Sequence, residues 1–351
     1  MRGTTIGAAL LAAGLLLAGC SNGGSGGPGS GSSDGLVIEP ISTDASAVQA
    51  ASPPTTGKAD AGQPSGLLAY YRGAAPDKLV VFCHGLHHNV EAHWLQYMLR
   101  VVRPDIAVVT TNYRDNDQLP ILRGAQDTIA ATLMAKARFP SIKTVYLLGV
   151  SLGGAVSGTA LTESVHVGSD GKGLYDYWVA LEPLSNTFEA YPEAAAALPE
   201  VATALEEETG GTPLTQPEAY QRRSPALRTA DMAAAGLRAV AIVHGVNDGL
   251  VTYNQGRELA LGLVASQIPV RLLTVLRHAE GQDPGTTGTG TIGGLAGLED
   301  DPFTLFRLAG HADEADATHP VMREGFLLLQ QMLDGSYDET TPYSEGVIDD
   351  G

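Results

Sequence analysis

Short apolar runs alternate along most of the chain with longer segments of helical character. Continuous apolar runs of this kind are typical of strands that are buried on both faces of a parallel sheet. Such runs lie at 67–72, 78–83, 106–111, 144–148, 178–181, 237–243 and 270–276. Helical segments lie at 91–103, 121–139, 189–208 and 321–333. Strands that alternate with helices predict an α/β fold in which helices wrap both sides of a parallel sheet.

One apolar run leads into Gly-Val-Ser-Leu-Gly at 149–153 and then into an Ala- and Gly-rich segment that can only be helical. This strand, turn and helix form the context that a nucleophile elbow requires. The turn is so tight that Gly149 and Gly153 are needed to avoid a collision, and Ser151 is pushed above the edge of the sheet. The N–H of Leu152 then points to the place where an oxyanion would form. A chance pentapeptide is the alternative, because the chain contains 43 glycines.

The first twenty residues have the pattern of an export signal. A weakly basic start precedes an apolar run at 6–18 that is too short to span a membrane as a stable helix. The run closes with Leu-Ala-Gly-Cys, which resembles the lipobox of bacterial lipoproteins and implies a lipidated Cys20. Residues 1–20 are therefore expected to be a lipoprotein signal peptide, the alternative being an ordinary cleaved signal with an incidental cysteine. Lipid chains would anchor the exported protein to the outer face of a bacterial membrane or to the outer membrane.

Composition divides the rest of the chain into three parts. Residues 21–65 are mainly Gly, Ser, Pro, Thr and Ala, which cannot bury enough surface to fold, so they predict a flexible tether. Leu-Val-Ile at 36–38 is an exception that would add an edge strand. The folded domain is expected at 66–335, and the acidic residues 336–351 are expected to form a disordered tail.

Overall composition excludes some functions. A chain of 351 residues with 44% hydrophobic and 17% charged residues is long enough for one large α/β domain. The net charge of −18 argues against nucleic acid as a partner and against a broad electrostatic hold on anionic lipid. With Cys20 lipidated, Cys83 has no partner for a disulfide and is expected to be a small core residue.

Two further stretches point to one superfamily. His-Gly at 84–85 follows an apolar run, and Val-Ala-Ile-Val-His-Gly-Val-Asn-Asp-Gly-Leu-Val occupies 240–251. Together with the Gly-x-Ser-x-Gly turn, they resemble the α/β-hydrolase superfamily, both its esterase and lipase members and its prolyl-oligopeptidase-like members. The resemblance covers about 66–333 and implies the α/β-hydrolase fold, a mostly parallel central sheet flanked by helices. It also implies a helical cap inserted at about 184–231.

The same resemblance assigns roles to single residues. Asp248 matches the acid of the catalytic triad, which would hold a histidine in the right tautomer and stabilise its imidazolium form. The alternative is an aspartate that serves only the Asn-Asp-Gly turn. The loop after Gly85 would donate a second oxyanion N–H, from Leu86 or His87, beside that of Leu152. Residues 182–186 follow another strand end and are expected to face the same pocket.

The histidine that completes the triad stays open among three positions. It should lie after the last strand and before or at the start of the final helix, where His319, His311 and His278 all occur. His319 stands at the helix entry in Thr-His-Pro, His311 follows a glycine as in many members of the superfamily, and His278 follows the strand directly. A Gly- and Thr-rich stretch at 281–298 resembles an insertion that moves the base downstream, which favours His319 and His311.

These residues predict a serine hydrolase that cleaves small acyl esters through an acyl-enzyme and needs no cofactor. A serine peptidase acting on short peptides is the first alternative, favoured by the similarity around Asp248. A surface-binding lipoprotein that kept the fold without turnover is the second. No metal site is expected, because His87, His88 and His93 lack supporting carboxylates or cysteines at ligand spacing.

Overall fold

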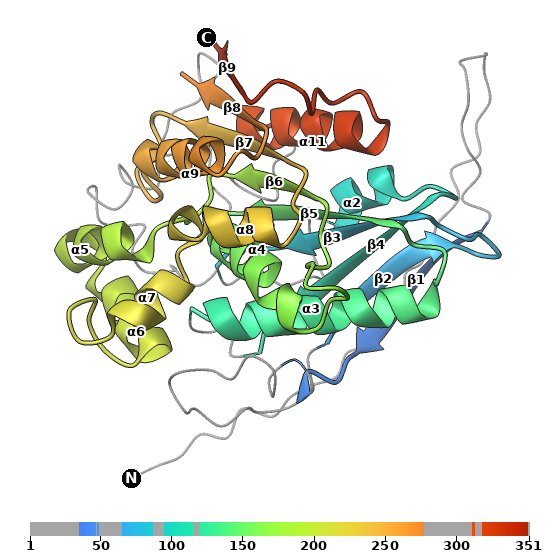
Figure 1. The fold of residues 1–351 in the computed structure, drawn as a ribbon, viewed down its shortest axis with the longest axis horizontal. Coiled ribbons are helices and arrows are strands. Elements are labelled where there is room, and N and C mark those ends of the chain that lie inside the picture. The colour runs from blue at the N-terminus through green and yellow to red at the C-terminus, as the bar shows by residue number, and fades with distance from the viewer. Residues whose placement is uncertain are drawn as a thin grey trace, which may run out of the picture. The chain divides into compact units, whose positions relative to one another are not determined.

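The computed structural model describes residues 35–46, 48, 65–86, 95–114, 119–276, 311–312 and 318–349. Within these residues nine strands form one sheet in the order β1-β2-β4-β3-β5-β6-β7-β8-β9 (Figure 1). Their bounds are β1 Leu36–Ser42, β2 Ser65–Tyr71, β3 Lys78–Cys83, β4 Ile106–Asn112, β5 Thr144–Val150, β6 Tyr177–Leu181, β7 Ala239–Gly245, β8 Val270–Val275 and β9 Tyr343–Ile348. β1 pairs antiparallel with β2 and β2 with β4, whereas all other neighbours are parallel. The predicted mostly parallel α/β architecture is confirmed.

Helices cover both faces of this sheet. α3 (Ile121–Arg138), α4 (Leu152–Glu163) and α9 (Tyr253–Ala265) contribute to one core, and α2 (Leu95–Val101) and α11 (Pro320–Leu333) contribute to the other. Successive side chains of a strand point to opposite faces. In β3, Leu79 and Val81 accordingly join the first core, while Val80 and Phe82 join the second. None of the helices in the described ranges is long and apolar enough to cross a membrane.

The cap predicted at about 184–231 is a set of short helices between β6 and β7. They are α5 (Thr187–Ala197), α6 (Pro199–Thr209), α7 (Pro217–Arg222), the 3₁₀ turn η2 (Pro225–Leu227) and α8 (Thr229–Ala234) (Figure 1). The helical segment expected at 189–208 is broken at Leu198, because a residue before proline is kept out of the helical conformation. Glu163, at the end of α4, forms ion pairs of 2.7 Å with Arg222 and 2.8 Å with Arg228. These ion pairs fasten the cap to the helix that follows Ser151.

The sheet begins earlier than the expected domain boundary at residue 66. β1 lies inside the segment 21–65 that composition assigned to a flexible tether, and it pairs with β2 in the register Val37↔Tyr70. The apolar residues 36–38 do form the edge strand that they predicted, and the strand runs on to Ser42. The strand extends beyond residue 38 because its backbone pairs with the free edge of β2, and backbone pairing needs few apolar side chains.

The expected disordered tail at 336–351 is wrong over most of its length. β9 adds a further parallel strand beside β8, in the register Tyr343↔Val270 to Ile348↔Val275. Asp338 fixes the turn before it, since its Oδ1 accepts hydrogen bonds from the N–H groups of Thr340 and Thr341 at 2.8 and 3.2 Å. The one acidic side chain of β9, Glu345, lies at an exposed position and does not disturb the ladder with β8, so an acidic composition did not prevent a strand.

Of the two cysteines, the structure describes only Cys83. Cys83 is fully buried at the end of β3, as expected of a small core residue. Cys20, together with the whole signal segment 1–20, lies outside the described residues.

Candidate active site

Ser151 occupies a strained turn between β5 and α4. Its backbone angles are φ 56° and ψ −121°, a region that residues other than glycine avoid at a cost on the order of 1–3 kcal/mol. Hydrogen bonds hold the turn: Ser151 N–H donates to the Leu181 carbonyl at 2.9 Å, and the Ser151 carbonyl accepts from Gly154 and Leu184. The local geometry is therefore that of the strand–turn–helix elbow which the sequence predicts.

The two flanking glycines are required by contact. A Cβ on Gly149 would lie 2.4 Å from the Gly153 carbonyl oxygen and 2.3 Å from Ser157 Oγ. A Cβ on Gly153 would lie 2.0 Å from the carbonyl oxygen of Cys83. The Ser157 hydroxyl is itself fixed, because it accepts a hydrogen bond from Trp178 Nε1 at 2.9 Å. Glycine at these two positions lets the start of α4 close against both β5 and the end of β3.

This close approach brings the two expected oxyanion donors into one region. Leu152 is the first residue of α4, where a backbone N–H has no partner within the helix. Leu86 lies just past β3, which pairs with β5 in the register Cys83↔Gly149. His84 stabilises that loop, since its Nδ1 lies 2.8 Å from the Gly85 carbonyl oxygen and its ring stacks on Tyr113 at 4.0 Å. His87, the other expected donor, lies outside the described residues, as do His88 and His93.

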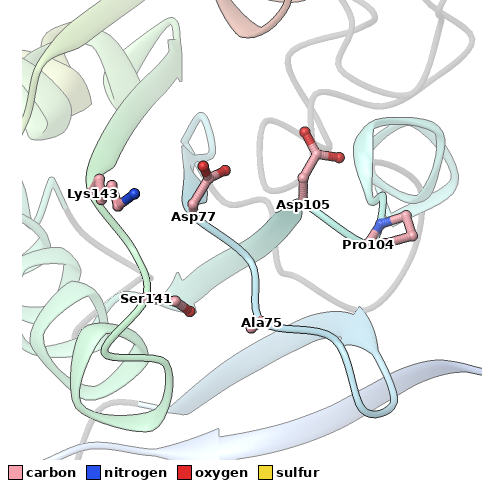
Figure 2. Close-up of a pocket in the computed structure, with 6 residues that line it drawn as sticks. All are labelled: Ala75, Asp77, Pro104, Asp105, Ser141 and Lys143. Atoms are coloured by element: carbon pink, nitrogen blue, oxygen red, sulfur yellow. The ribbon is translucent and has the colours of Figure 1, made fainter.

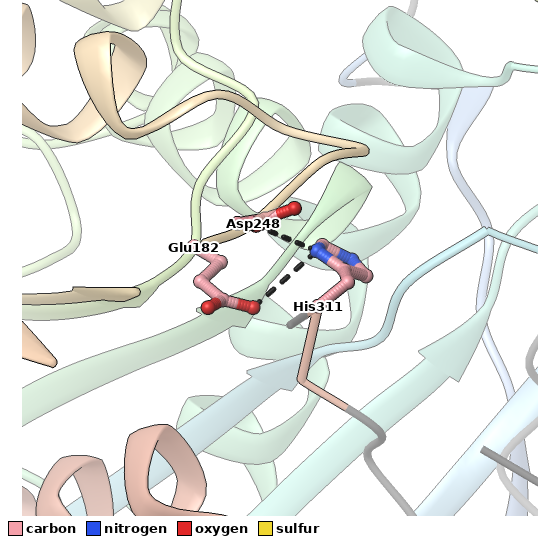
Figure 3. Close-up of side chains that lie close together, drawn as sticks. All are labelled: Glu182, Asp248 and His311. Carbon is pink, nitrogen blue, oxygen red and sulfur yellow. Dashed lines mark hydrogen bonds and ion pairs between the residues drawn. The ribbon is translucent and has the colours of Figure 1, made fainter. Parts of the chain in front are cut away.

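Asp248 lies in the loop after β7 with its side chain fully buried. Its Oδ1 accepts hydrogen bonds from the N–H groups of Leu250 and Val251, both at 2.9 Å. Its Oδ2 lies 2.7 Å from His311 Nδ1 (Figure 3). Burial opposes ionisation, but the charge of His311, the hydrogen bond from its Nδ1 and the nearby His244 outweigh it and hold the pKa of Asp248 well below its usual range. Because an ionised carboxylate only accepts hydrogen bonds, His311 carries its proton on Nδ1 when neutral and keeps Nε2 as a base.

The structure separates two of the three candidate histidines. His311 is hydrogen-bonded to Asp248, whereas His319 is the residue that caps α11, with its Nδ1 accepting from Val321 N–H at 3.3 Å. The sequence favoured His319 and His311 and left the choice between them open, but the ring of His319 is turned toward the backbone of the helix that it caps. His278 lies outside the described residues.

Glu182, at the end of β6, is a member of this cluster whose role the sequence did not reveal. Its buried carboxylate accepts hydrogen bonds from Gly245 N–H (Oε1, 3.2 Å) and Ala312 N–H (Oε2, 2.5 Å). Oε2 also lies 3.3 Å from His311 Nδ1. Burial and the adjacent charge of Asp248 raise the pKa of Glu182 well above its usual range. The available signal was a glutamate directly after a buried strand that neighbours β7, since carboxyl ends of parallel strands meet at one edge.

A metal ion is the other chemistry that this cluster could host. One ligand atom from each of Glu182, Asp248 and His311 lies within 4.8 Å of the others. Both Glu182 oxygens and Asp248 Oδ1, however, already accept backbone N–H groups, and Asp248 Oδ2 lies at hydrogen-bond distance from Nδ1. Hydrogen bonds thus already explain why these three side chains lie close together, and the oxygens that a metal would need accept N–H groups. The cluster fits acid–base chemistry better than a metal centre.

A hollow of about 500 Å³ lies at the opposite edge of the sheet (Figure 2). It is lined by residues at or before the amino ends of β3, β4 and β5: Ala75, Asp77, Pro104, Asp105, Ser141 and Lys143. Ser151 and Asp248 follow the carboxyl ends of their strands. This hollow is therefore separate from the candidate active site.

Comparison with known proteins gives the fold. No protein-family model matches the chain, and no curated protein sequence matches it. Among solved structures, acylaminoacyl peptidase from Pyrococcus horikoshii is similar, with a TM-score of 0.54 and 13% identity over 86% of this chain and 42% of that chain. An acylaminoacyl peptidase in complex with Z-Gly-Gly-Phe-chloromethyl ketone gives 0.50 and 14% over 82% and 44%. The chain thus spans less than half the length of either peptidase. It has the α/β-hydrolase fold, as the resemblance implied.

Proposed function

We propose that this protein is a serine hydrolase in which Ser151 is the nucleophile, His311 the general base and Asp248 the acid that orients it. The observation that carries the proposal is the 2.7 Å contact between His311 Nδ1 and the buried, ionised Asp248. Ser151 in its strained turn completes the set of residue types that a triad requires. The metal-free, cofactor-free chemistry expected from the sequence is part of this proposal.

The proposed reaction follows the protons. Asp248 holds His311 Nδ1–H, so Nε2 accepts the proton of Ser151 Oγ while the oxygen attacks an acyl carbonyl. The N–H groups of Leu152 and Leu86 stabilise the oxyanion that forms. Protonated His311 then gives its proton to the leaving group, and an acyl-enzyme remains on Ser151. Water, deprotonated by His311 in the same way, releases the acyl group.

For the substrate, we propose the amide bond of short peptides. The support is an analogy of fold, since the two structures compared above, with TM-scores of 0.54 and 0.50, are named as acylaminoacyl peptidases. The small acyl ester expected first from the sequence becomes the second candidate, because the same triad cleaves activated esters as well. Aminoacyl p-nitroanilides and matched p-nitrophenyl esters separate the two: turnover of esters alone would refute the peptidase proposal.

Catalysis itself is tested by covalent labelling. A fluorophosphonate reacts with an activated serine, so it is expected to modify Ser151 of the wild-type protein and to leave Ser151→Ala unmodified. Mass spectrometry of the labelled peptide identifies the site. A protein that is folded but not labelled at Ser151 would instead be the surface-binding lipoprotein without turnover that the sequence left open.

We also propose that Cys20 carries lipid and anchors the exported protein to the outer face of a bacterial membrane or to the outer membrane. The support is the sequence pattern at 6–20. Cys20→Ala is expected to move the protein out of the membrane fraction, and its recovery there at the wild-type level would contradict the anchor.

A further inference from the structure

We propose that Glu182 is a second acid of the site, one that shares a proton with Asp248 in the resting protein and can replace Asp248 in orienting His311. The inference rests on the proposed triad. It makes Glu182 a positioning residue, because it acts on the reaction only through Asp248 and His311.

The geometry places both carboxylates on the same imidazole nitrogen. His311 Nδ1 lies 2.7 Å from Asp248 Oδ2 and 3.3 Å from Glu182 Oε2 (Figure 3). The two acids come from the ends of β6 and β7, which pair in the register Leu181↔Val243. His311 therefore faces two acceptors with one N–H, of which Asp248 is the nearer.

Charge explains why the two acids differ. Both side chains are fully buried, and one oxygen of each lies within 4.8 Å of the other and of His311 Nδ1. Hydrogen bonding to Asp248 is among the causes that raise the pKa of Glu182, after burial and the charge of Asp248. Two like charges at that distance in a buried site cannot both persist, so one acid keeps its proton. Burial and the charge of Asp248 raise the pKa of Glu182, whereas the positive partners of Asp248 lower its pKa. The titratable groups facing the pair are His311 and His244, the latter 3.6 Å from Asp248 Oδ2.

The backbone conformation of Glu182 is also unusual, and several hydrogen bonds hold the residue in place. Its φ of 42° lies in the left-handed region, which a glutamate adopts only when its surroundings impose it. Its N–H donates to the Val243 carbonyl at 2.9 Å, and both carboxyl oxygens accept backbone N–H groups. A residue held this firmly keeps its carboxyl group in place when a neighbour changes.

Removal of the Asp248 charge should therefore recruit Glu182. In Asp248→Asn the like charge is gone, so Glu182 can release its proton and accept His311 Nδ1–H. The asparagine amide can donate to the same carboxylate, which keeps its NH₂ group away from Nδ1. The histidine tautomer needed for catalysis is then preserved, unlike in a triad with a single acid, where this substitution lowers kcat about 10⁴-fold.

A double-mutant cycle tests the proposal on p-nitrophenyl acetate. Asp248→Asn is expected to lower kcat/KM only about 10²-fold, and Asp248→Asn with Glu182→Gln about 10⁴-fold, as for a triad without an acid. Glu182→Gln in the wild-type background should lower it only a few-fold, because its amide can imitate the protonated acid. Glu163→Gln, at another buried glutamate, should have the same effect in both backgrounds. Equal effects of Glu182→Gln in both backgrounds overturn the proposal.

Two readouts exclude a purely structural role. The activity of Asp248→Asn should rise with pH as Glu182 ionises, in addition to the rise that deprotonation of His311 gives in every variant. This additional rise should vanish in the double variant, and identical profiles overturn the proposal. Infrared difference spectra at pH 7 should show a protonated carboxyl band that Glu182→Gln removes, also in Ser151→Ala. The band reports the protonated Glu182 carboxyl group even in an inactive protein. Its absence would contradict the role proposed for Glu182, whereas a failure of turnover would contradict the proposed triad.

Discussion

Two aspartates at opposite edges of the sheet show how surroundings change one chemical group. Asp105, before β4, pairs with Lys78 Nζ at 3.0 Å and is 47% exposed. Asp248, after β7, is fully buried and pairs with His311 at 2.7 Å. Burial opposes ionisation of both, and positive partners nonetheless lower both pKa values. Water and mobile ions screen Asp105, whereas the charge of Asp248 acts on one neighbour at fixed geometry. The same kind of group is therefore a solvated surface ion pair at Asp105 and an orienting acid of the candidate active site at Asp248.

The largest expected effect at the carboxyl edge follows Ser151→Ala. Loss of the nucleophile should lower kcat/KM for p-nitrophenyl acetate on the order of 10⁵–10⁶-fold, leaving what the oxyanion donors supply. The free energy of unfolding should change by less than about 1 kcal/mol, because no described packing depends on the hydroxyl. Steady-state kinetics and urea unfolding measure both quantities. Hydrolysis at the wild-type rate would exclude Ser151 as the nucleophile.

The next largest effect is expected on stability, at the glycine that lets α4 pack closely against the end of β3. Gly153→Ala forces a Cβ within 2.0 Å of a backbone carbonyl oxygen, so the free energy of unfolding should fall by roughly 3 kcal/mol or more. Gly73→Ala is the control, since its Cβ meets nothing within 4 Å and only its positive φ matters. That variant should lose only about 1 kcal/mol. Equal losses in thermal or urea unfolding would mean that close approach does not dominate at Gly153.

The pH dependence of stability should single out Glu182. Its raised pKa means that the folded state holds a proton which the unfolded state releases above about pH 4.3. The contribution to stability is complete below that pH and is lost as the pH rises toward the folded-state value, by at most about 1.4 kcal/mol per pH unit. Glu182→Gln cannot ionise, so its unfolding free energy relative to wild type should rise over this range. A difference that is constant with pH in urea titrations would contradict the buried protonated acid.

The smallest effect is expected at the amino edge. Asp105→Asn removes the exposed pair with Lys78, which contributes about 0–1 kcal/mol in such a setting. Turnover should be unchanged, because the pair lies at the amino ends of the strands, whereas Ser151 follows the carboxyl end of β5. Added salt should weaken the pair in the wild-type protein and have no such effect in the variant. A loss of activity in Asp105→Asn would break the distinction between the two edges.

Local features of the site could be predicted from the sequence. The turn at Ser151 depends on neighbours in the chain, so Gly149 and Gly153 revealed it directly. The buried strands were equally accessible, because burial on both faces leaves a continuous apolar run. β3 begins and ends at the expected residues, and α11 begins one residue before its expected start.

Features that depend on distant segments could not be predicted. The choice between His311 and His319 depends on where the chain returns after 281–298, and both positions have ordinary local sequences. The role of Glu182 follows from the pairing of β6 with β7, which no local pattern records. β9 was missed for the same reason, since its backbone is held by the edge of β8. These are contacts across long sequence separations, which composition and periodicity do not encode.

The most direct test of the triad compares the two histidines that the structure separates. Fluorophosphonate labelling of Ser151 should collapse in His311→Ala, because the hydroxyl loses its base. It should persist in His319→Ala, where loss of the cap on α11 should reduce stability by roughly 0.5–2 kcal/mol. Labelling rates measured at one pH on proteins shown to be folded give the answer. Near wild-type labelling of His311→Ala, or its loss only in His319→Ala, would contradict the account.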